Sequence, residues 1–586
     1  MNNKRILLAI GLVLLFALPA LPVPEFWITQ LNYIGMFSLV ALGLVLLTGV
    51  GGLTSFGQAA FVGLGAYATA LLTTRYGLSP WLGLLAGLVV TGVVALVLAL
   101  LTLRMSGHYL PLATICWALS LNFTMANMEF LGKYDGLLGV PPLALFGIDL
   151  REGRAIYVLI WAIAVLAALA VRNLLDSRPG RAIRALNGAT TMAEAMGVST
   201  FRYKVIIFVV AALLACISGW LFAHVQRTVN PSPFGLKMGI EYLFMAVVGG
   251  VGTVGGAFVG AAVFKLIEDQ LKELLPVLLG GSGNYEIIVL GIVLVLIIKY
   301  APKGLWPYVA SRFPAAPRAR STAERLPHGA KPQAGELLLD VQAVRKEFGG
   351  LVAVNDVSFQ IKAGEIVGLI GPNGAGKSTT FNLVSGVLAL TGGAVNFRGE
   401  TVSGRPSREI ARRGMSRTFQ HVKMIADMTV LENVALGSYL RGASGTTRAM
   451  LRLDRSEEQR LFAEAQAQLE RIGMAAQMHE LAGNLALGPQ RLMEIARALC
   501  SDPALLLLDE PAAGLRLKEK QALAEVLRQL KREGISILLV EHDMEFVMGL
   551  TDRIVVMEFG TKLIEGTPEE VQASPAVMAA YLGTEH

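Results

Sequence analysis

Long apolar runs dominate the first 308 residues, whereas residues after about 336 mix apolar and polar positions as a soluble protein does. A helix that crosses a bilayer needs about 20 mostly apolar residues. Eight apolar runs are candidates for such spans, the last of them shorter than the rest: residues 6–23, 31–50, 55–73, 81–103, 110–128, 156–171, 205–222 and 287–298. The pattern predicts an α-helical transmembrane domain over residues 1–308.

The placement of basic residues predicts how these spans are oriented. Cytoplasmic loops of membrane proteins carry an excess of lysine and arginine. With Lys4 and Arg5 inside, alternation of the spans also places the basic loop at residues 172–204 in the cytoplasm. The first run has small residues near its end, at 17–20, like a cleaved signal peptide. Because further apolar runs follow, we interpret it as an uncleaved first helix.

The apolar run Ile240–Leu266 does not fit the alternation, because one crossing there would leave the soluble half outside the cell. Residues 249–256, in its middle, include five glycines, which weaken a helix interior. We predict two half-helices that enter and leave on the same side, a re-entrant pair of the kind found where backbone is buried in protein or lines a cavity. The alternative is one kinked span, with a further span elsewhere.

Two other features of this half concern solute movement and its control. Polar residues are costly inside apolar spans, so Gln58 and Asn122 are candidates for a solute path. The alternative for each is a position at a helix end or a hydrogen bond to a neighbouring helix. The loop at residues 176–204 contains two short helical patterns, at 181–186 and 191–196. It predicts a compact element, although a connector whose charges only set the topology is the alternative.

Residues 309–335 are rich in proline, alanine and arginine and show no apolar period, so they predict a flexible linker. The domain after it, residues 336–586, contains the sequence GPNGAGKS between a strand-like run and a helix-compatible run. This fits the P-loop pattern, in which curled backbone amides and a helix N-terminus hold phosphate oxygens. The predicted nucleotide-binding residues are Gly371, Pro372, Asn373, Gly374, Ala375, Gly376, Lys377, Ser378 and Thr379.

Four leucines, residues 505–508, predict a buried parallel strand that ends in Asp509 and Glu510. Ligands bind at the carboxyl ends of strands in such sheets. Asp509 and the Ser378 hydroxyl are therefore candidates for a Mg²⁺ site, and Glu510 for polarising the attacking water. His542 ends another buried strand, where it faces the γ-phosphate, and Phe348 is either an adenine-stacking ring or a core aromatic.

The amino-acid composition adds only two expectations about partners and cysteine chemistry. The chain has a formal net charge of +7, but in a membrane protein an excess of basic residues marks cytoplasmic loops, so we expect no nucleic acid partner. The three cysteines lie in apolar runs or in the soluble half, and we expect neither a disulfide nor a metal site from them.

The order and spacing of the P-loop, Gln420, Asp509, Glu510 and His542 resemble those of an ABC transporter ATPase, an α/β P-loop fold with a helical subdomain. The resemblance implies that Gln420 is the Q-loop residue, a Mg²⁺ ligand and a catalytic residue together with Glu510 and His542. The stretches 416–421, 482–488 and 565–583 are similar to the ATPase subunit of branched-chain amino acid importers. Residues 51–61, 193–197, 247–256 and 301–305 are similar to the permease of the same importers. By this resemblance, Glu194, Ala195, Met196 and Gly197 belong to the loop that couples the permease to an ATPase.

The chain departs from the family pattern in its signature motif, which would complete the nucleotide site of a partner ATPase. The usual Leu-Ser-Gly-Gly-Gln corresponds to Leu485, Ala486, Leu487, Gly488 and Pro489 here. Ala486 lacks the serine hydroxyl, and Pro489, which suits the first helical position, contributes no N–H. Arg516 stands where related chains usually have Asn or Asp. We interpret these changes as a sign of two unlike ATPases with unequal sites.

The resemblance implies a fused permease and ATPase of a bacterial inner-membrane importer for branched-chain or other apolar amino acids, with ATP and Mg²⁺ as ligands. One permease half and one ATPase require a second permease, a second ATPase and an external binding protein. Alternatives are import of another small solute, such as an amide, urea or an aromatic acid, and, less in keeping with the short loops and intact catalytic residues, an exporter or a non-transport ATPase.

Overall fold

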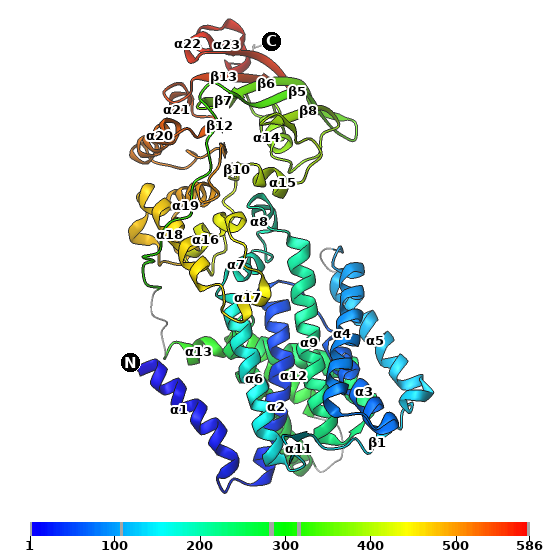
Figure 1. The fold of residues 1–586 in the computed structure, drawn as a ribbon. Helices are drawn as coiled ribbons and strands as arrows, with labels where there is room; N and C mark the ends of the chain where they lie inside the picture. The colour runs from blue at the N-terminus through cyan, green and yellow to red at the C-terminus, as the bar shows by residue number, and fades with distance from the viewer. Residues whose placement is uncertain (1–2, 106–108, 280–285, 313–317, 583–586) are drawn as a thin grey trace. The chain divides into compact units, whose positions relative to one another are not determined.

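The computed structural model describes residues 3–105, 109–279, 286–312 and 318–582 (Figure 1). The chain divides into two compact units. The helical unit comprises Met1–Asp176 and Phe201–Ala316, and the soluble unit comprises Ser177–Thr200 and Pro317–His586. The loop that interrupts the transmembrane sequence therefore belongs to the same unit as the predicted ATPase domain. We call Ser177–Thr200 the docking segment.

The helical unit is built almost entirely from helices, as the apolar runs predict. Its helices are α1 (Asn3–Ala17), α2 (Glu25–Leu44), α3 (Gln58–Tyr76), α4 (Pro80–Thr102), α5 (Tyr109–Asn127), α6 (Gly153–Leu175), α9 (Thr200–Gln226), α10 (Leu236–Gly250), α11 (Val254–Leu279), α12 (Glu286–Tyr300) and α13 (Trp306–Ala310). Among the described residues, five helical segments are long and apolar enough to cross a membrane, or up to six if the bent pair α10–α11 is one span. The full number of spans stays a prediction.

The predicted break in the run Ile240–Leu266 is confirmed. Helices α10 and α11 bend by 118° at the break and pack side by side. Glycines make the close approach possible: a Cβ on Gly249 would lie 1.8 Å from the carbonyl oxygen of Gly256, and one on Gly260 would lie 1.8 Å from that of Met245. Whether the pair is re-entrant or one broken span stays a prediction.

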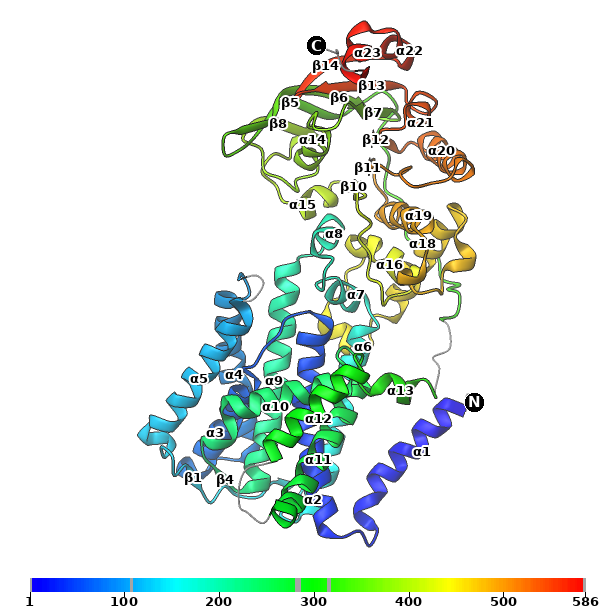
Figure 2. The ribbon, with the colours of Figure 1, turned by 180° about the vertical axis from the view of Figure 1, so that it is seen from behind.

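The soluble unit contains a six-stranded sheet with the order β10-β11-β12-β7-β13-β14, in which only β14 is antiparallel to its neighbour. A second, antiparallel sheet has the order β6-β5-β8-β9. Figure 2 shows these strands from behind. The strands of the two sheets are β5 (Leu337–Phe348), β6 (Leu351–Lys362), β7 (Ile366–Ile370), β8 (Gly392–Phe397), β9 (Glu400–Thr401), β10 (Met415–Arg417), β11 (Leu505–Asp509), β12 (Ser536–Val540), β13 (Arg553–Glu558) and β14 (Thr561–Gly566).

The leucine run of β11 explains why the larger sheet is buried on both faces. Side chains alternate between the faces of a strand, and Leu506 and Leu508 join one apolar cluster while Leu505 and Leu507 join another. The first cluster includes the helices on one face, and the second includes the antiparallel sheet. Because both faces of β11 are covered, its carboxyl end, where Asp509 lies, is the part of the strand at which a ligand can bind.

Helices make up the rest of the soluble unit. Those that frame the site are α14 (Lys377–Val384), α16 (Val430–Ala435), the 3₁₀ helix η5 (Leu436–Arg441), α17 (Thr446–Met450), α18 (Arg455–Arg471), α19 (Leu487–Leu499) and α20 (Leu517–Arg532), and the docking segment forms α7 (Arg178–Arg184) and α8 (Thr190–Ala195). The two short helical patterns predicted for this segment are thus both present.

The second half of the predicted linker is not free of the soluble unit. Residues 318–335, which we call the strap, contact the rest of the unit through a series of side-chain bonds, from Arg320 with Glu470 at 2.9 Å to Lys331 with Asp502 at 2.7 Å. Leu326 is buried. Polar contacts need no apolar period, so no sequence pattern marks them. The expectation of a flexible linker over 309–335 is therefore corrected for the strap.

Candidate functional site

The P-loop follows the carboxyl end of β7 and leads into α14. Gly371 has a φ of 149°, and a Cβ there would lie 2.1 Å from the carbonyl oxygen of Met557. Gly376, at the start of α14, has a left-handed φ of 93° that favours glycine. The Lys377 ammonium donates to the carbonyl oxygens of Gly371 and Pro372, at 2.7 and 2.9 Å. Burial lowers the pKa of Lys377, and the carboxylates of Glu510 and Asp509 oppose this.

A cavity of about 480 Å³ opens over this loop, a volume within the usual range of ligand sites. Its lining brings together Leu351, Val352, Ala353, Asn373, Gly374, Ala375, Gly376, Lys377, Ser378, Thr379, Gln420, Glu510, His542, Phe559 and Gly560. The ring of Phe348, the predicted adenine contact, is not among them; it lies beside the Lys346 ammonium instead. Phe559, 87% exposed at the cavity, was missed by sequence reasoning.

Glu510 is held at the rim of the cavity by two predicted partners. Gln420 Nε2 donates to Glu510 Oε1 at 3.0 Å, and His542 Nε2 lies 2.8 Å from the same oxygen. Glu510 has a φ of 48°, a conformation that is costly for a residue with a side chain and is found at sites where geometry serves function. Three side chains from three different segments therefore converge, as the spacing predicts.

Asp509, one residue earlier, is buried and differently placed. Its backbone N–H donates to Thr418 Oγ1, and the Arg417 guanidinium lies 3.9 Å from its carboxylate. Oδ1 has no hydrogen-bond partner among the described residues. Burial raises the pKa of the Asp509 carboxyl, and Arg417 opposes this. An acceptor oxygen that is buried and unpaired suits a cation ligand, so the residues fit the predicted Mg²⁺ site.

The altered signature motif lies at the start of α19, away from the cavity lining. Ala486 occupies the N-cap, where it offers no side-chain oxygen to the first amides. Because α19 begins at Leu487, Pro489 is its third residue and not its first, which corrects the sequence expectation. A missing N–H still costs little there, since the first four amides of a helix have no intrahelical acceptor.

Arg178 attaches the docking segment to the rest of the soluble unit. Its guanidinium donates to three carbonyl oxygens at the end of η5, those of Tyr439, Gly442 and Ser444, at 2.6, 2.6 and 2.7 Å. It also lies over the Tyr439 ring, 4.7 Å from the centroid. Carbonyl oxygens at the ends of helices and turns have no intrahelical donor, and the Arg178 guanidinium donates to them instead.

Arg181 adds a buried ion pair to this contact. Its guanidinium donates to both carboxylate oxygens of Glu458, at 2.7 and 3.3 Å, and lies over the Phe462 ring at 4.8 Å. The side chains of Arg181 and Glu458 are only 4% and 10% exposed. Of the predicted coupling residues, Gly197 approaches the soluble unit, because a Cβ there would lie 2.3 Å from Leu440. Sequence reasoning identified the loop and its basic residues, Arg178 and Arg181 among them, but not the partners of these two arginines.

The candidate path residues have different surroundings. Gln58 is the first residue of α3, just after an irregular stretch that follows a π-helical turn at Val45–Val50. It is fully buried, and neither amide atom has a partner in the described parts of the chain. Asn122 is half-buried and donates to the carbonyl oxygen of Pro231 at 3.0 Å. A role for either residue in solute passage stays a prediction.

Comparison with known families supports two domains. Residues 27–298 match the model described as "Branched-chain amino acid transport system / permease component". Residues 354–513 match the ABC transporter model, and residues 562–586 match the model "Branched-chain amino acid ATP-binding cassette transporter". The matches fall on the helical unit and on the soluble unit.

Curated relatives support the same assignment. The chain is similar to the high-affinity branched-chain amino acid transport ATP-binding protein LivG of Salmonella typhimurium, with 45% identity over 42% of this chain and 98% of the relative. The corresponding protein BraF of Pseudomonas aeruginosa is 39% identical over the same shares. A probable LivG of Archaeoglobus fulgidus is 36% identical over 42% of this chain and 96% of the relative. The chain therefore belongs to the family of branched-chain amino acid ABC transporters, with a permease domain and an ATP-binding domain in one polypeptide.

Proposed function

We propose that this protein imports branched-chain amino acids across the bacterial cytoplasmic membrane, with ATP hydrolysis as the source of energy. One observation carries the proposal: a loop of the permease sequence forms a compact unit with an ATPase domain in which the P-loop, Gln420, Glu510 and His542 line one cavity. A permease half and an ATPase that share a polypeptide, with the docking segment of the permease sequence buried against the ATPase domain, are built to move together. Import needs both.

The residues of the cavity divide the chemistry among them. The P-loop amides and the Lys377 ammonium bind the phosphates, which requires that Lys377 exchange its contacts with Gly371 and Pro372 for phosphate oxygens. Glu510 orients and polarises the attacking water, and His542 and Gln420 hold its carboxylate in place. Ser378 and Asp509 would hold Mg²⁺, which, when bound, neutralises charge on the phosphates.

The docking segment then connects this chemistry to the permease. It lies between α6 and α9 in sequence, so a movement of η5 or α18 is passed through Arg178 and Arg181 to the ends of two transmembrane helices. The contact is buried and charged, so the docking segment and the ATPase domain stay together as they move, since separating a buried pair leaves an uncompensated charge.

A complete transporter requires three further components: a second permease, a second ATPase and an external binding protein that delivers the solute. We propose that the second ATPase is a different chain, because the signature of this one has Ala486 and Pro489. The cavity with Lys377 and Glu510 then hydrolyses ATP when a partner with a fuller signature completes it.

Turnover of the assembled complex tests this proposal. Glu510→Gln keeps the size and hydrogen bonding of the side chain and removes the carboxylate charge. We expect ATP turnover to fall to a small fraction of wild type, although nucleotide still binds. Near-normal turnover would show that another site carries hydrolysis. Stimulation of turnover by the cognate binding protein with leucine, compared with an amide, urea or an aromatic acid, distinguishes the solute classes.

A further inference from the structure

The strap, residues 318–335, bridges two parts of the soluble unit. At one end its contacts are to α18: Ser321 Oγ donates to the carbonyl oxygen of Gln459 at 2.7 Å, and the Arg325 guanidinium lies 3.5 Å from the Glu464 carboxylate. At the other end its contacts are to Asp502, in the loop before β11. A cavity of about 430 Å³ lies along the strap between these two ends. The strap therefore bridges α18 and the loop before β11, with the cavity beside it.

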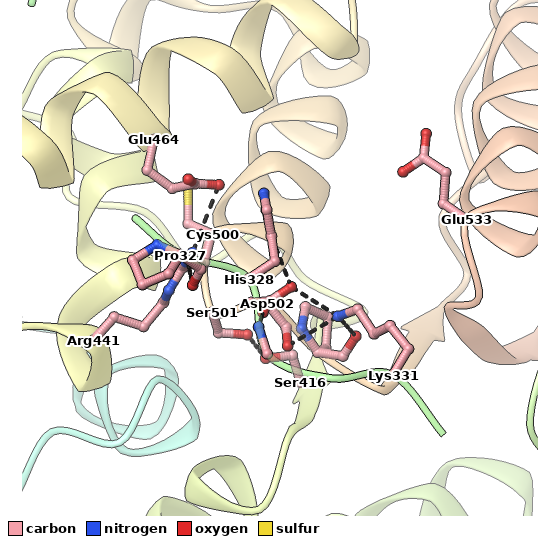
Figure 3. A network of polar contacts seen from close by, with 12 residues as sticks. Pro327, His328, Lys331, Ser416, Arg441, Glu464, Cys500, Ser501, Asp502 and Glu533 are labelled. Carbon is pink, nitrogen blue, oxygen red and sulfur yellow. Dashed lines mark hydrogen bonds and ion pairs between the residues drawn. The ribbon is translucent and has the colours of Figure 1, made fainter. Parts of the chain in front are cut away.

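The contact with Asp502 is the more elaborate one (Figure 3). Lys331 Nζ reaches three acceptors, namely Asp502 Oδ1 at 2.7 Å and the carbonyl oxygens of Pro503 and Asp502 at 2.9 and 3.3 Å. His328 Nδ1 lies 3.1 Å from Oδ1, and the backbone N–H of Gly329 donates to Oδ2 at 2.7 Å. All three donors of the ammonium are used, so this end of the strap fixes both the side chain and the backbone of the loop.

The same loop is tied to the docking site from its other side. Arg441, the last residue of η5, donates to the carbonyl oxygen of Cys500 at 3.0 Å and to that of Pro327 in the strap at 2.9 Å. Its guanidinium lies 3.6 Å from the fully buried Glu464 carboxylate, which the strap's Arg325 also approaches. Because η5 receives Arg178 of the docking segment, the docking site, the strap and the loop Cys500–Pro503 form one connected network.

This loop leads directly to the catalytic carboxylates. It continues into β11, which ends in Asp509 and is followed by Glu510. Ser501 Oγ lies 2.5 Å from Ser416 Oγ on β10, the strand that precedes Gln420. Two routes, one along β11 and one along β10, thus run from the loop to groups that meet at Glu510.

We propose that the strap is a positioning element of the ATPase, in which Lys331 holds the loop Cys500–Pro503 and Arg325 holds α18 through Glu464, so that movement of the docking segment reaches Glu510. The idea rests on the proposed function, since it concerns how transport stimulates hydrolysis. The strap lies between the matched ranges 27–298 and 354–513 of the family models. The strap is thus part of the segment that joins the permease domain to the ATPase domain.

Variants of Lys331 in the full chain, assembled with its partner subunits and reconstituted, test the proposal. The readout is the ratio of ATP turnover with solute-loaded binding protein to basal turnover, together with KM for ATP. We expect Lys331→Ala to lower the ratio by about tenfold, the factor associated with one charge-assisted hydrogen bond, while KM for ATP is unchanged. Glu324→Gln, at an exposed position of the same strap, should leave the ratio at the wild-type value.

A rescue variant separates positioning from a general loss of structure. Lys331→Arg should restore most of the ratio, because a cation again donates to Asp502 and joins strap and loop. A wild-type ratio in Lys331→Ala, or a loss that Lys331→Arg does not restore, would overturn the proposal. Failure of the proposed function is distinguishable, because the wild-type complex would then show no stimulation by the loaded binding protein.

Discussion

The buried pair Arg181–Glu458 gives the sharpest test of docking within one chain. Glu458→Gln removes the carboxylate charge and leaves the Arg181 guanidinium, 4% exposed, without its counter-ion. Removing one partner of a buried pair costs roughly 3–5 kcal/mol, which is on the order of a hundred- to several-thousandfold in the docking equilibrium. The glutamate also accepts the backbone N–H of Arg178, so the variant loosens the main anchor of the segment as well.

The assay is the amount of solute imported per ATP hydrolysed by the reconstituted transporter. We expect Glu458→Gln to retain basal hydrolysis and to lose most of the import per ATP. The matched control is Glu400→Gln, which breaks the pair between Glu400 and Arg413, whose side chains are 62% and 25% exposed. An exposed ion pair is screened by water and contributes little to stability, so this variant should behave as wild type.

A double-mutant cycle identifies the pair itself. If the two side chains act together, Arg181→Ala with Glu458→Ala should impair import per ATP no more than the more severe single change. Independent, additive losses would refute the assignment of coupling to this pair, as would normal import per ATP in Glu458→Gln.

Three further predictions follow from the structure. Phe559→Ala should raise KM for ATP several-fold without changing kcat, since an aromatic contact is worth about 0.5–1.5 kcal/mol. If KM rose in Phe348→Ala and not in Phe559→Ala, Phe348 would be the adenine contact after all. Ala486→Ser should raise the melting temperature in calorimetry by a few degrees, because an N-cap hydroxyl adds about 1 kcal/mol; an unchanged or lower value would contradict the capping geometry. Burial raises the pKa of Asp502, but the bonds from Lys331, Gly329 and His328 outweigh this and bring it to about 2. A carboxyl group whose pKa is depressed in the folded state stabilises the fold above the ordinary pKa of 3.8, and this stabilisation is lost as the pH falls through the folded-state pKa. At neutral pH, the unfolding free energy of wild type should exceed that of Asp502→Asn by roughly 2 kcal/mol, and this difference should shrink between about pH 4 and pH 2. A difference that does not change with pH would contradict the prediction.

Much of the fold was predictable because its signals are local. A run of leucines at 505–508 is sufficient to predict a doubly covered strand, and glycines at 249–256 are sufficient to predict a helix break. The P-loop fixes its own geometry through glycine and lysine spacing. Gln420, Glu510 and His542 come together because strand ends in a parallel sheet meet at one edge.

The remaining features depend on pairs that are far apart in sequence. Arg181 and Glu458 are separated by 277 residues, and no pattern near either one marks the other as its partner. The strap has no apolar period, and its order comes from Lys331 and Arg325 finding carboxylates in another part of the domain. Phe559 was missed for the same reason, since it reaches the cavity from a turn near the end of the chain.

The central claim is that the ATP cavity of this chain drives solute movement through its own permease half. Uptake of labelled leucine into proteoliposomes that contain the assembled transporter, binding protein and ATP tests it most directly. We expect uptake that requires ATP and is lost in Glu510→Gln. Uptake that continues without ATP, or that persists in Glu510→Gln, would contradict the account.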